Sequence, residues 1–190
     1  FLGGGIKVQV KSSNGNIQGI GDRRGFQFYD GPLVILVNKF SASASEILAG
    51  AIQDYERGLV LGSDTFGKGT VQRVQELSRG QLKFTESKFY RVSGKSTQNK
   101  GISPDIILPS PINESEYGES TLPKALGYDV ISKTKTRNFN RVPFSKQIFT
   151  KDHKDRVDTS VIFNHYKTLN SWRKNQENEK EGLRENKLEL

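Results

Sequence analysis

Three polar residues in the first half of the chain, Ser43, Lys68 and Gln72, have types and a spacing that could perform nucleophilic catalysis. A serine needs a base before it can act as a nucleophile, and a neutral lysine amine can be that base. A free lysine has a pKa of about 10.4, and burial lowers this pKa because desolvation penalises the charged form. Gln72, four residues beyond Lys68, could accept a hydrogen bond from the amine and orient it.

The corner around Ser43 could also stabilise an oxyanion. If a helix begins there, the N–H groups of Ala44 and Ser45 lack intrahelical acceptors and lie at the positive end of the helix dipole. One such donor is typically worth about 3 kcal/mol in a transition state. The same corner allows a purely structural interpretation, because Ser43 and Glu46 form the S-x-x-E pattern of a capping box.

Two other kinds of chemistry fit the sequence less well. Residues 62–70, GSDTFGKGT, nearly match the phosphate-binding pattern G-x-x-x-x-G-K-[ST], but Gly69 takes the place of the Mg²⁺-binding hydroxyl. The segment that follows also has the pattern of a strand and not of a helix. A Ser-His-Asp arrangement would require His153 or His165, in the polar C-terminal part, to fold back over the core.

The elements around Ser43 and Lys68 are predicted to form a βαβ unit. Residues 33–37 are apolar and rich in β-branched side chains, which predicts a buried strand. Apolar residues recur with helical spacing over 47–55, and residues 59–61 begin a second short strand. Because such units gather functional groups at the carboxyl ends of their strands, we expect Ser43 and Lys68 to meet there.

The rest of the chain reads as strands, turns and a helical end. The Asn14-Gly15 pair is a strong hairpin signal. Strands are predicted over residues 6–10, 26–29, 71–76, 81–85, 88–92 and 106–108. Residues 113–118 are polar and acidic, which predicts a linker. Residues 122–190 are expected to form short helices, with an Asn, Lys and Glu-rich end from residue 175 that is prone to fray.

The composition excludes several classes of protein. The 190 residues are 33% hydrophobic and 26% charged, as expected for a domain with a modest core. The net charge of +8 is spread along the chain, which favours solubility over a nucleic-acid surface. There is no cysteine, so no disulfide or thiolate nucleophile, and no apolar run approaches the roughly 20 residues of a membrane span. Because the chain begins at Phe1 and contains no methionine, we expect it to be part of a longer polypeptide.

The chain resembles the carboxy-terminal processing (tail-specific) serine peptidases, a Ser-Lys dyad family of bacterial envelopes and plastids. The resemblance lies in FSASASEILAGAIQDY followed by GSDTFGKGTVQ, and KFYRVSGKSTQNKGISPDIILP is similar to a later strand and turn of the same family. It covers about residues 1–110. It implies that Ser43 is the nucleophile, that Lys68 is its general base and that Gln72 orients the lysine.

The resemblance also implies a fold and a function. Residues 1–110 would form the C-terminal half of an α/β peptidase core with a crotonase-like mixed sheet, and residues 111–190 a linker and a mostly helical extension. The activity would be that of a serine endopeptidase that processes proteins from their C-terminal tails through an acyl-enzyme, without a metal or nucleotide cofactor. Its partners would be protein or peptide substrates with apolar tails, and an adaptor protein is a further candidate. The expected location is the periplasm or cell envelope.

Two features of that family are not present in this sequence. Family members have a PDZ domain that captures the substrate tail, and an R-x-N-x-G-G segment that supplies a second oxyanion donor. Gly3-Gly4-Gly5 lacks the preceding arginine and asparagine. We therefore expect the C-terminal half of a peptidase, inactive by itself. A second hypothesis belongs to a different functional class: the chain would be a non-catalytic binding fragment, or pseudo-peptidase, in which Ser43 only caps a helix.

Overall fold

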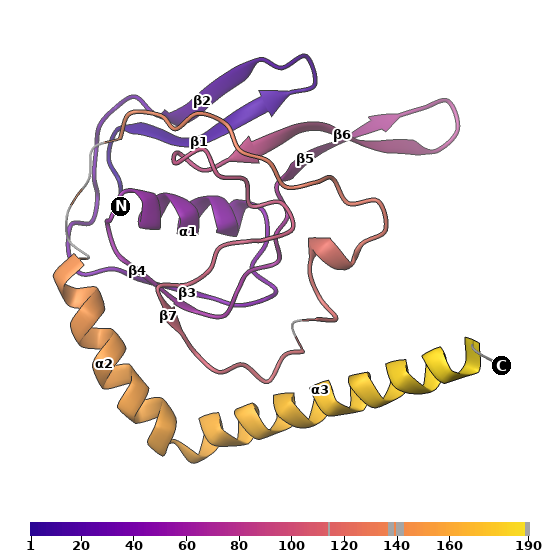
Figure 1. Ribbon diagram of the computed structural model, residues 1–190. Helices are drawn as coiled ribbons and strands as arrows, with labels where there is room; N and C mark the ends of the chain where they lie inside the picture. The colour runs from indigo at the N-terminus through magenta and orange to yellow at the C-terminus, as the bar shows by residue number, and fades with distance from the viewer. Residues whose placement is uncertain (114, 137–138, 140–142, 189–190) are drawn as a thin grey trace.

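The core of the molecule is a helix between two sheets (Figure 1). A computed structural model describes residues 1–113, 115–136, 139 and 143–188. The first sheet is antiparallel, in the order β2-β1-β6-β5, and the second is parallel, in the order β3-β4-β7. The helix between them is α1 (Ala44–Asp54). The strands are β1 (Gly5–Ser12), β2 (Ile17–Asp22), β3 (Val34–Val37), β4 (Leu59–Gly62), β5 (Thr70–Glu76), β6 (Gln81–Tyr90) and β7 (Ile106–Ile107).

The predicted α/β class is confirmed, with the strands divided between two sheets. Small residues let α1 approach both of them. Ala49 packs with Val37 and Val60 of the parallel sheet, whereas Ala51 and Ile52 belong to a second cluster that includes Ile6 of the first sheet and Ile35 of β3. The expected helical face is wrong in one place, because Leu48 lies 41% exposed and Ala49 is buried instead.

The strand predicted over residues 33–37 is buried on one face only. Successive side chains of a strand point to opposite faces. Ile35 and Val37 pack against α1, while Val34 and Leu36 point away from it and are 52% and 72% exposed. The outer edge of β3 has no strand partner within the described parts of the chain.

Two further strand predictions are wrong. Residues 26–29 form no strand, because their backbone is held by side chains: Arg57 Nη2 and Gln27 Nε2 each donate to the Tyr29 carbonyl at 3.0 Å. The strands expected over 81–85 and 88–92 are one continuous strand, β6. Residues 81–88 of β6 pair with β5 and residues 87–90 pair with β1, so one long strand joins the two hairpins.

The C-terminal part consists of a 3₁₀ turn, η1 (Glu119–Thr121), and two long helices, α2 (Pro143–Thr159) and α3 (Val161–Leu188). The prediction of short helices is therefore wrong. The expected frayed end from residue 175 is helical as far as Leu188, and residues 189–190 lie outside the described part. Ser160 alone separates the two helices, which form the angled arm below the core in Figure 1.

Polar contacts attach this arm to the core. The Lys146 amine of α2 donates to Asp105 Oδ1 at 2.9 Å, just before β7. On α3, the Asn170 amide donates to the Ser110 carbonyl at 2.8 Å. Farther out, α3 carries Trp172, the single tryptophan of the chain, which is 59% exposed. None of the helices among the described residues is both long and apolar enough to cross a membrane.

Candidate active site

Ser43 occupies a strained backbone position at the start of α1. Its φ of 57° and ψ of −110° lie in a region that residues with a side chain rarely adopt. The chain reaches this position from β3 through a tight turn in which the Ser41 N–H donates to the Asn38 carbonyl at 2.9 Å. Strain of this kind persists only where the surroundings hold it, and it is common at functional sites. A sharp turn from strand to helix also presents a serine at the end of a sheet.

Glu46, in the first turn of α1, holds the serine corner and the lysine loop together. Its Oε2 accepts from the Ser43 N–H at 2.7 Å and from the Lys68 N–H at 3.0 Å. Its Oε1 accepts from the Gly67 N–H at 2.7 Å and from the Thr65 hydroxyl at 2.5 Å. Burial raises the pKa of this fully buried carboxyl, although the four donors act in the opposite direction.

A second set of contacts fixes the same two segments. The Phe66 N–H donates to the Ser41 carbonyl at 3.0 Å, so the loop backbone bonds directly to the serine corner. The Thr65 hydroxyl also accepts from the Ile102 N–H at 2.7 Å. The buried Lys39 side chain donates to the Thr65 carbonyl at 3.2 Å. The relative position of the two segments is therefore set by buried hydrogen bonds and not by flexible side chains.

The lysine amine has one of its two expected partners. Lys68 Nζ donates to Gln72 Oε1 at 3.2 Å. Lys68 is half-buried and Gln72, near the start of β5, is exposed. Both residues are in the described part of the chain, where no hydrogen bond joins the Ser43 hydroxyl to the Lys68 amine. Side chains thus link Lys68 to Gln72, whereas Ser43 and Lys68 are linked through their backbone N–H groups and Glu46.

The first turn of α1 provides one unoccupied donor. The Ser45 N–H donates to the Ala42 carbonyl at 3.2 Å, so it is already used. The Ala44 N–H has no acceptor in the part of the chain that the structure describes. It is adjacent to Ser43 at the positive end of the helix dipole, the arrangement that an oxyanion requires.

The loop is not arranged to bind a nucleotide phosphate. A phosphate-binding loop offers its backbone N–H groups to the ligand and leads into a helix. Here the N–H groups of Gly67 and Lys68 donate to Glu46, and that of Gly69 donates to Gln98 Oε1 at 2.9 Å. The loop then leads into β5. The donors that would bind a phosphate are therefore occupied by side chains.

The remaining candidates for catalysis lie elsewhere. His153 Nε2 is 3.0 Å from the Ile107 carbonyl, where α2 meets β7, and the ring of His165 lies beside that of Tyr166 on α3. Within the described ranges, no group of three or more His, Cys, Asp and Glu side chains is placed to hold a metal ion.

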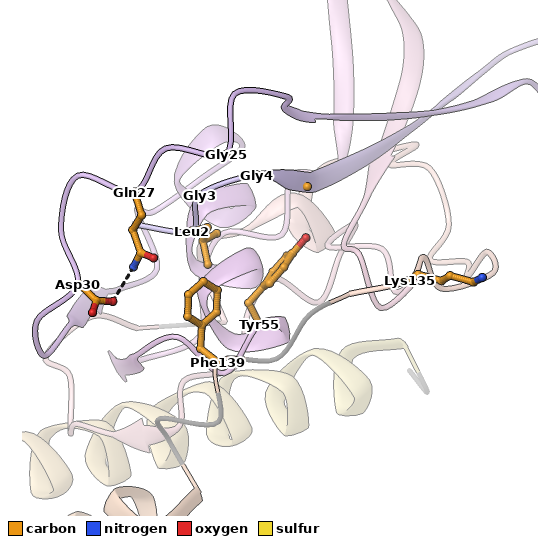
Figure 2. Close-up of a pocket in the computed structure, with 10 residues that line it drawn as sticks. Leu2, Gly3, Gly4, Gly25, Gln27, Asp30, Tyr55, Lys135 and Phe139 are labelled. Carbon is orange, nitrogen blue, oxygen red and sulfur yellow. Dashed lines mark hydrogen bonds between the residues drawn. The ribbon is translucent and has the colours of Figure 1, made fainter.

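A cavity of about 710 Å³ lies at the other end of α1 (Figure 2). Tyr55 and Phe139 line it together with glycines of the first segment, and the Lys135 side chain points away from it. The Tyr55 hydroxyl donates to the Ile6 carbonyl at 2.6 Å, and burial raises the pKa of Tyr55. Because this cavity is at the end of α1 opposite Ser43, it is separate from the candidate site.

Sequence reasoning missed part of the loop's support. The sequence pattern indicates only a helix cap at Glu46, and this position predicts that its carboxylate faces the Ser43 N–H. Residues 113–118, expected to be a linker, lead directly to the lysine loop: the Glu119 N–H donates to the Phe66 carbonyl at 2.9 Å. The Glu119 carboxylate accepts from Gln98 Nε2 at 3.2 Å. No local pattern signals these contacts, because they join residues far apart in the chain.

Comparison with known proteins identifies the class to which this fold and site belong, the serine peptidases. The family described as Peptidase family S41 matches residues 1–108, and the C-terminal domain of tail specific protease matches residues 112–188. Since the first match covers more than half of the 190 residues, the chain belongs to peptidase family S41.

Individual relatives agree with this family. The tail-specific protease of Haemophilus influenzae is 40% identical over 169 residues, which are 83% of this chain and 24% of that protein. The carboxy-terminal-processing protease of Bartonella bacilliformis is 44% identical over 100 residues, 52% of this chain and 21% of that protein. The solved structure of a photosystem II D1 C-terminal processing protease matches with a TM-score of 0.52 and 39% identity, over 57% of this chain and 28% of that one. The chain thus spans about a quarter of the length of these relatives.

Proposed function

We propose that this chain carries the catalytic serine and lysine of a carboxy-terminal processing serine peptidase that acts through an acyl-enzyme. Ser43 Oγ would attack the scissile carbonyl, and Lys68 would take the hydroxyl proton and return it to the leaving amine. Gln72 would orient the lysine, and the Ala44 N–H would donate to the oxyanion. The observation that supports this most is that Glu46 bonds to the backbone N–H groups of both Ser43 and Lys68.

In this proposal the chain is the C-terminal part of a longer peptidase, with residues 1–110 in the core and 111–190 as the extension. Support comes from the relatives, of which it spans about a quarter. The rest of the polypeptide would bring a second oxyanion donor and a PDZ domain for apolar C-terminal tails of protein substrates. The protein would act in the periplasm or cell envelope, and an adaptor could deliver its substrates. Residues 1–190 by themselves would have little or no activity.

A serine-directed fluorophosphonate tests the nucleophile. In the full-length polypeptide the reagent should label Ser43, and Ser43→Ala should abolish both labelling and peptide cleavage. The alanine variant should still fold, because loss of a helix cap typically costs about 1 kcal/mol. Ser45→Ala, two residues farther along the exposed helix start, is the matched control and should be labelled normally. Undiminished cleavage by Ser43→Ala would exclude the proposal.

Substitutions of Lys68 test the base. Lys68→Arg should be inactive, because a guanidinium stays protonated and cannot accept the serine's proton. If Ser43 only caps a helix, Lys68→Arg should have no effect on cleavage. An arginine variant that still cleaves peptides would therefore show that Ser43 and Lys68 are not the catalytic pair.

A further inference from the structure

Two exposed aromatic side chains meet beside the candidate active site. Phe40 is 59% exposed and Tyr117 is 42% exposed. Their ring centroids are 5.3 Å apart and the rings are inclined by 73°, an edge-to-face contact. The two rings form a small exposed apolar surface, and its place beside the two proposed catalytic segments distinguishes it from other exposed apolar residues of the chain.

Each aromatic residue lies in or close to a segment that belongs to, or is bonded to, the proposed catalytic pair. Phe40 lies in the turn that leads to Ser43, and its N–H donates to Asn38 Oδ1 at 3.0 Å. Tyr117 belongs to the C-terminal extension, but the backbone two residues later donates to the Phe66 carbonyl of the lysine loop. The pair therefore bridges the serine segment and the lysine loop on the outside of the molecule.

The backbone around the pair is firmly held. Gly118 has a φ of 131°, and a Cβ there would lie 3.1 Å from the Phe66 carbonyl oxygen and 3.2 Å from the Lys39 side chain. The neighbouring Glu119 is buried and bonded to Gln98. Tyr117 is thus fixed by close backbone packing on one side, although its own ring is open to solvent.

We propose that Phe40 and Tyr117 together bind an apolar side chain of the polypeptide substrate next to the scissile bond. This inference rests on the proposed peptidase function, and it gives the C-terminal extension a direct part in substrate selection. The occupant is an extended protein chain because the pair spans the two segments between which the scissile bond would lie. An apolar side chain suits it because the two rings offer apolar surface, and the neighbouring Lys39 amine is buried and bonded to Thr65.

The test is a set of peptides that share one cleavage site and carry Leu, Ala or Ser at each position adjacent to the scissile bond. With the unmodified full-length enzyme, one position should show a preference for Leu over Ser in kcat/KM. Phe40→Ala and Tyr117→Ala should each lower kcat/KM for the Leu peptide by about tenfold or more and leave that for the Ser peptide nearly unchanged. Tyr117→Phe should keep the preference, because the contact involves the ring.

Phe26 and Phe28 provide the matched control. They are also exposed, at 68% and 89%, and their ring centroids are also 5.3 Å apart, but they lie on the segment between β2 and β3. Phe26→Ala and Phe28→Ala should leave the preference unchanged. Fluorophosphonate labelling of Ser43 and thermal unfolding are measured for every variant.

The two proposals fail in different ways. An unchanged Leu-to-Ser preference in Phe40→Ala and Tyr117→Ala, with normal labelling of Ser43, would overturn the inference and leave the peptidase function intact. An equal loss for all peptides would also overturn it, because it would mean that the pair only supports the loop. Cleavage that persists in Ser43→Ala would instead overturn the proposed function.

Discussion

At the residue scale, the site is organised by one buried carboxylate and one strained serine. Glu46 accepts four hydrogen bonds from the serine corner and the lysine loop. Ser43 adopts a φ of 57° at the same corner. Backbone strain at Ser43 and desolvation of the Glu46 carboxylate both cost stability, and both hold particular groups in fixed positions. Preorganised catalytic sites are built in the same way.

Replacing Ser43 with glycine should remove this strain. Glycine adopts positive φ without the cost that other residues incur, and losing the serine cap to glycine costs only a few tenths of a kcal/mol. We expect Ser43→Gly to raise the free energy of unfolding by about 1 kcal/mol in urea titrations. Ser45→Gly, at an ordinary helical position, should lower it by up to about 1 kcal/mol. A less stable Ser43→Gly variant would show that the serine is not strained.

Glu46 should give a pH-dependent contribution to stability. Burial raises its pKa in the folded protein above the ordinary value of 4.5, so the folded state binds the proton more tightly than the unfolded state. The contribution is therefore fully present below pH 4.5 and is lost as the pH rises through the raised pKa. The measurement is the free energy of unfolding of the unmodified protein and of Glu46→Gln across this range.

The comparison with Glu46→Gln cancels the titration of the other carboxyl groups. As the pH rises, the unmodified protein should lose stability relative to the variant, which cannot ionise at this position. A difference between the two proteins that does not change with pH would contradict the raised pKa of Glu46.

Local patterns were sufficient for the elements that carry the predicted site. A capping box, helical spacing and a glycine-rich loop between strands locate Ser43 and Lys68 correctly on the fold. The contacts that hold these elements together were not predictable, because Glu46 reaches a loop some 20 residues away and Glu119 reaches the same loop from the extension. Nor did the pattern reveal the length of α3, since few apolar residues mark its face.

At the element scale, α1 is attached to the first sheet by a partly buried ion pair. Arg91, which follows β6, donates to both carboxylate oxygens of Asp54, at 3.1 Å from Nε to Oδ2. The Ser93 N–H and hydroxyl add bonds to Asp54 Oδ2 at 3.2 and 2.9 Å. This cluster fixes the end of α1 opposite Ser43, so it aligns the helix that carries the proposed nucleophile.

Breaking this pair should be costly. Asp54→Ala removes the partner of the Arg91 guanidinium, whose side chain is 16% exposed in the structure. We expect the free energy of unfolding to fall by about 3 kcal/mol. Asp158→Ala, which breaks the exposed pair with Lys167, is the control and should change it by less than about 1 kcal/mol. The double variant Asp54→Ala/Arg91→Met should recover part of the loss, because it removes the unpaired charge. If Asp54→Ala and Asp158→Ala lower the free energy of unfolding equally in urea titrations, the Asp54–Arg91 pair does not hold α1 to the first sheet.

At the scale of the whole molecule, the parallel sheet is covered less than such sheets usually are. Parallel strands are normally buried on both faces, yet Val34 and Leu36 of β3 are exposed and its edge is open among the described residues. Open apolar edges promote association between chains, and lysine on an edge strand suppresses it.

Residues 1–190 alone should therefore self-associate, and Leu36→Lys should reduce this without loss of stability. Sedimentation velocity over a range of concentrations measures the effect. The matched control is Leu48→Lys, because this leucine is 41% exposed but belongs to α1 and not to β3. If both variants associate like the unmodified chain, the β3 face is not the contact surface.

The position of Trp172 has a practical consequence for studies of this protein in solution. Since it is the single tryptophan and lies exposed on α3, tryptophan fluorescence excited selectively reports on the extension alone. The six tyrosines are divided between the two parts: Tyr55 and Tyr90 are buried in the core, whereas Tyr166 lies on α3 beside His165. Tryptophan emission therefore provides a signal for the arm alone, whereas tyrosine absorbance reports on the arm and the body together. Followed together during denaturation, they would reveal whether the arm melts before the core or with it.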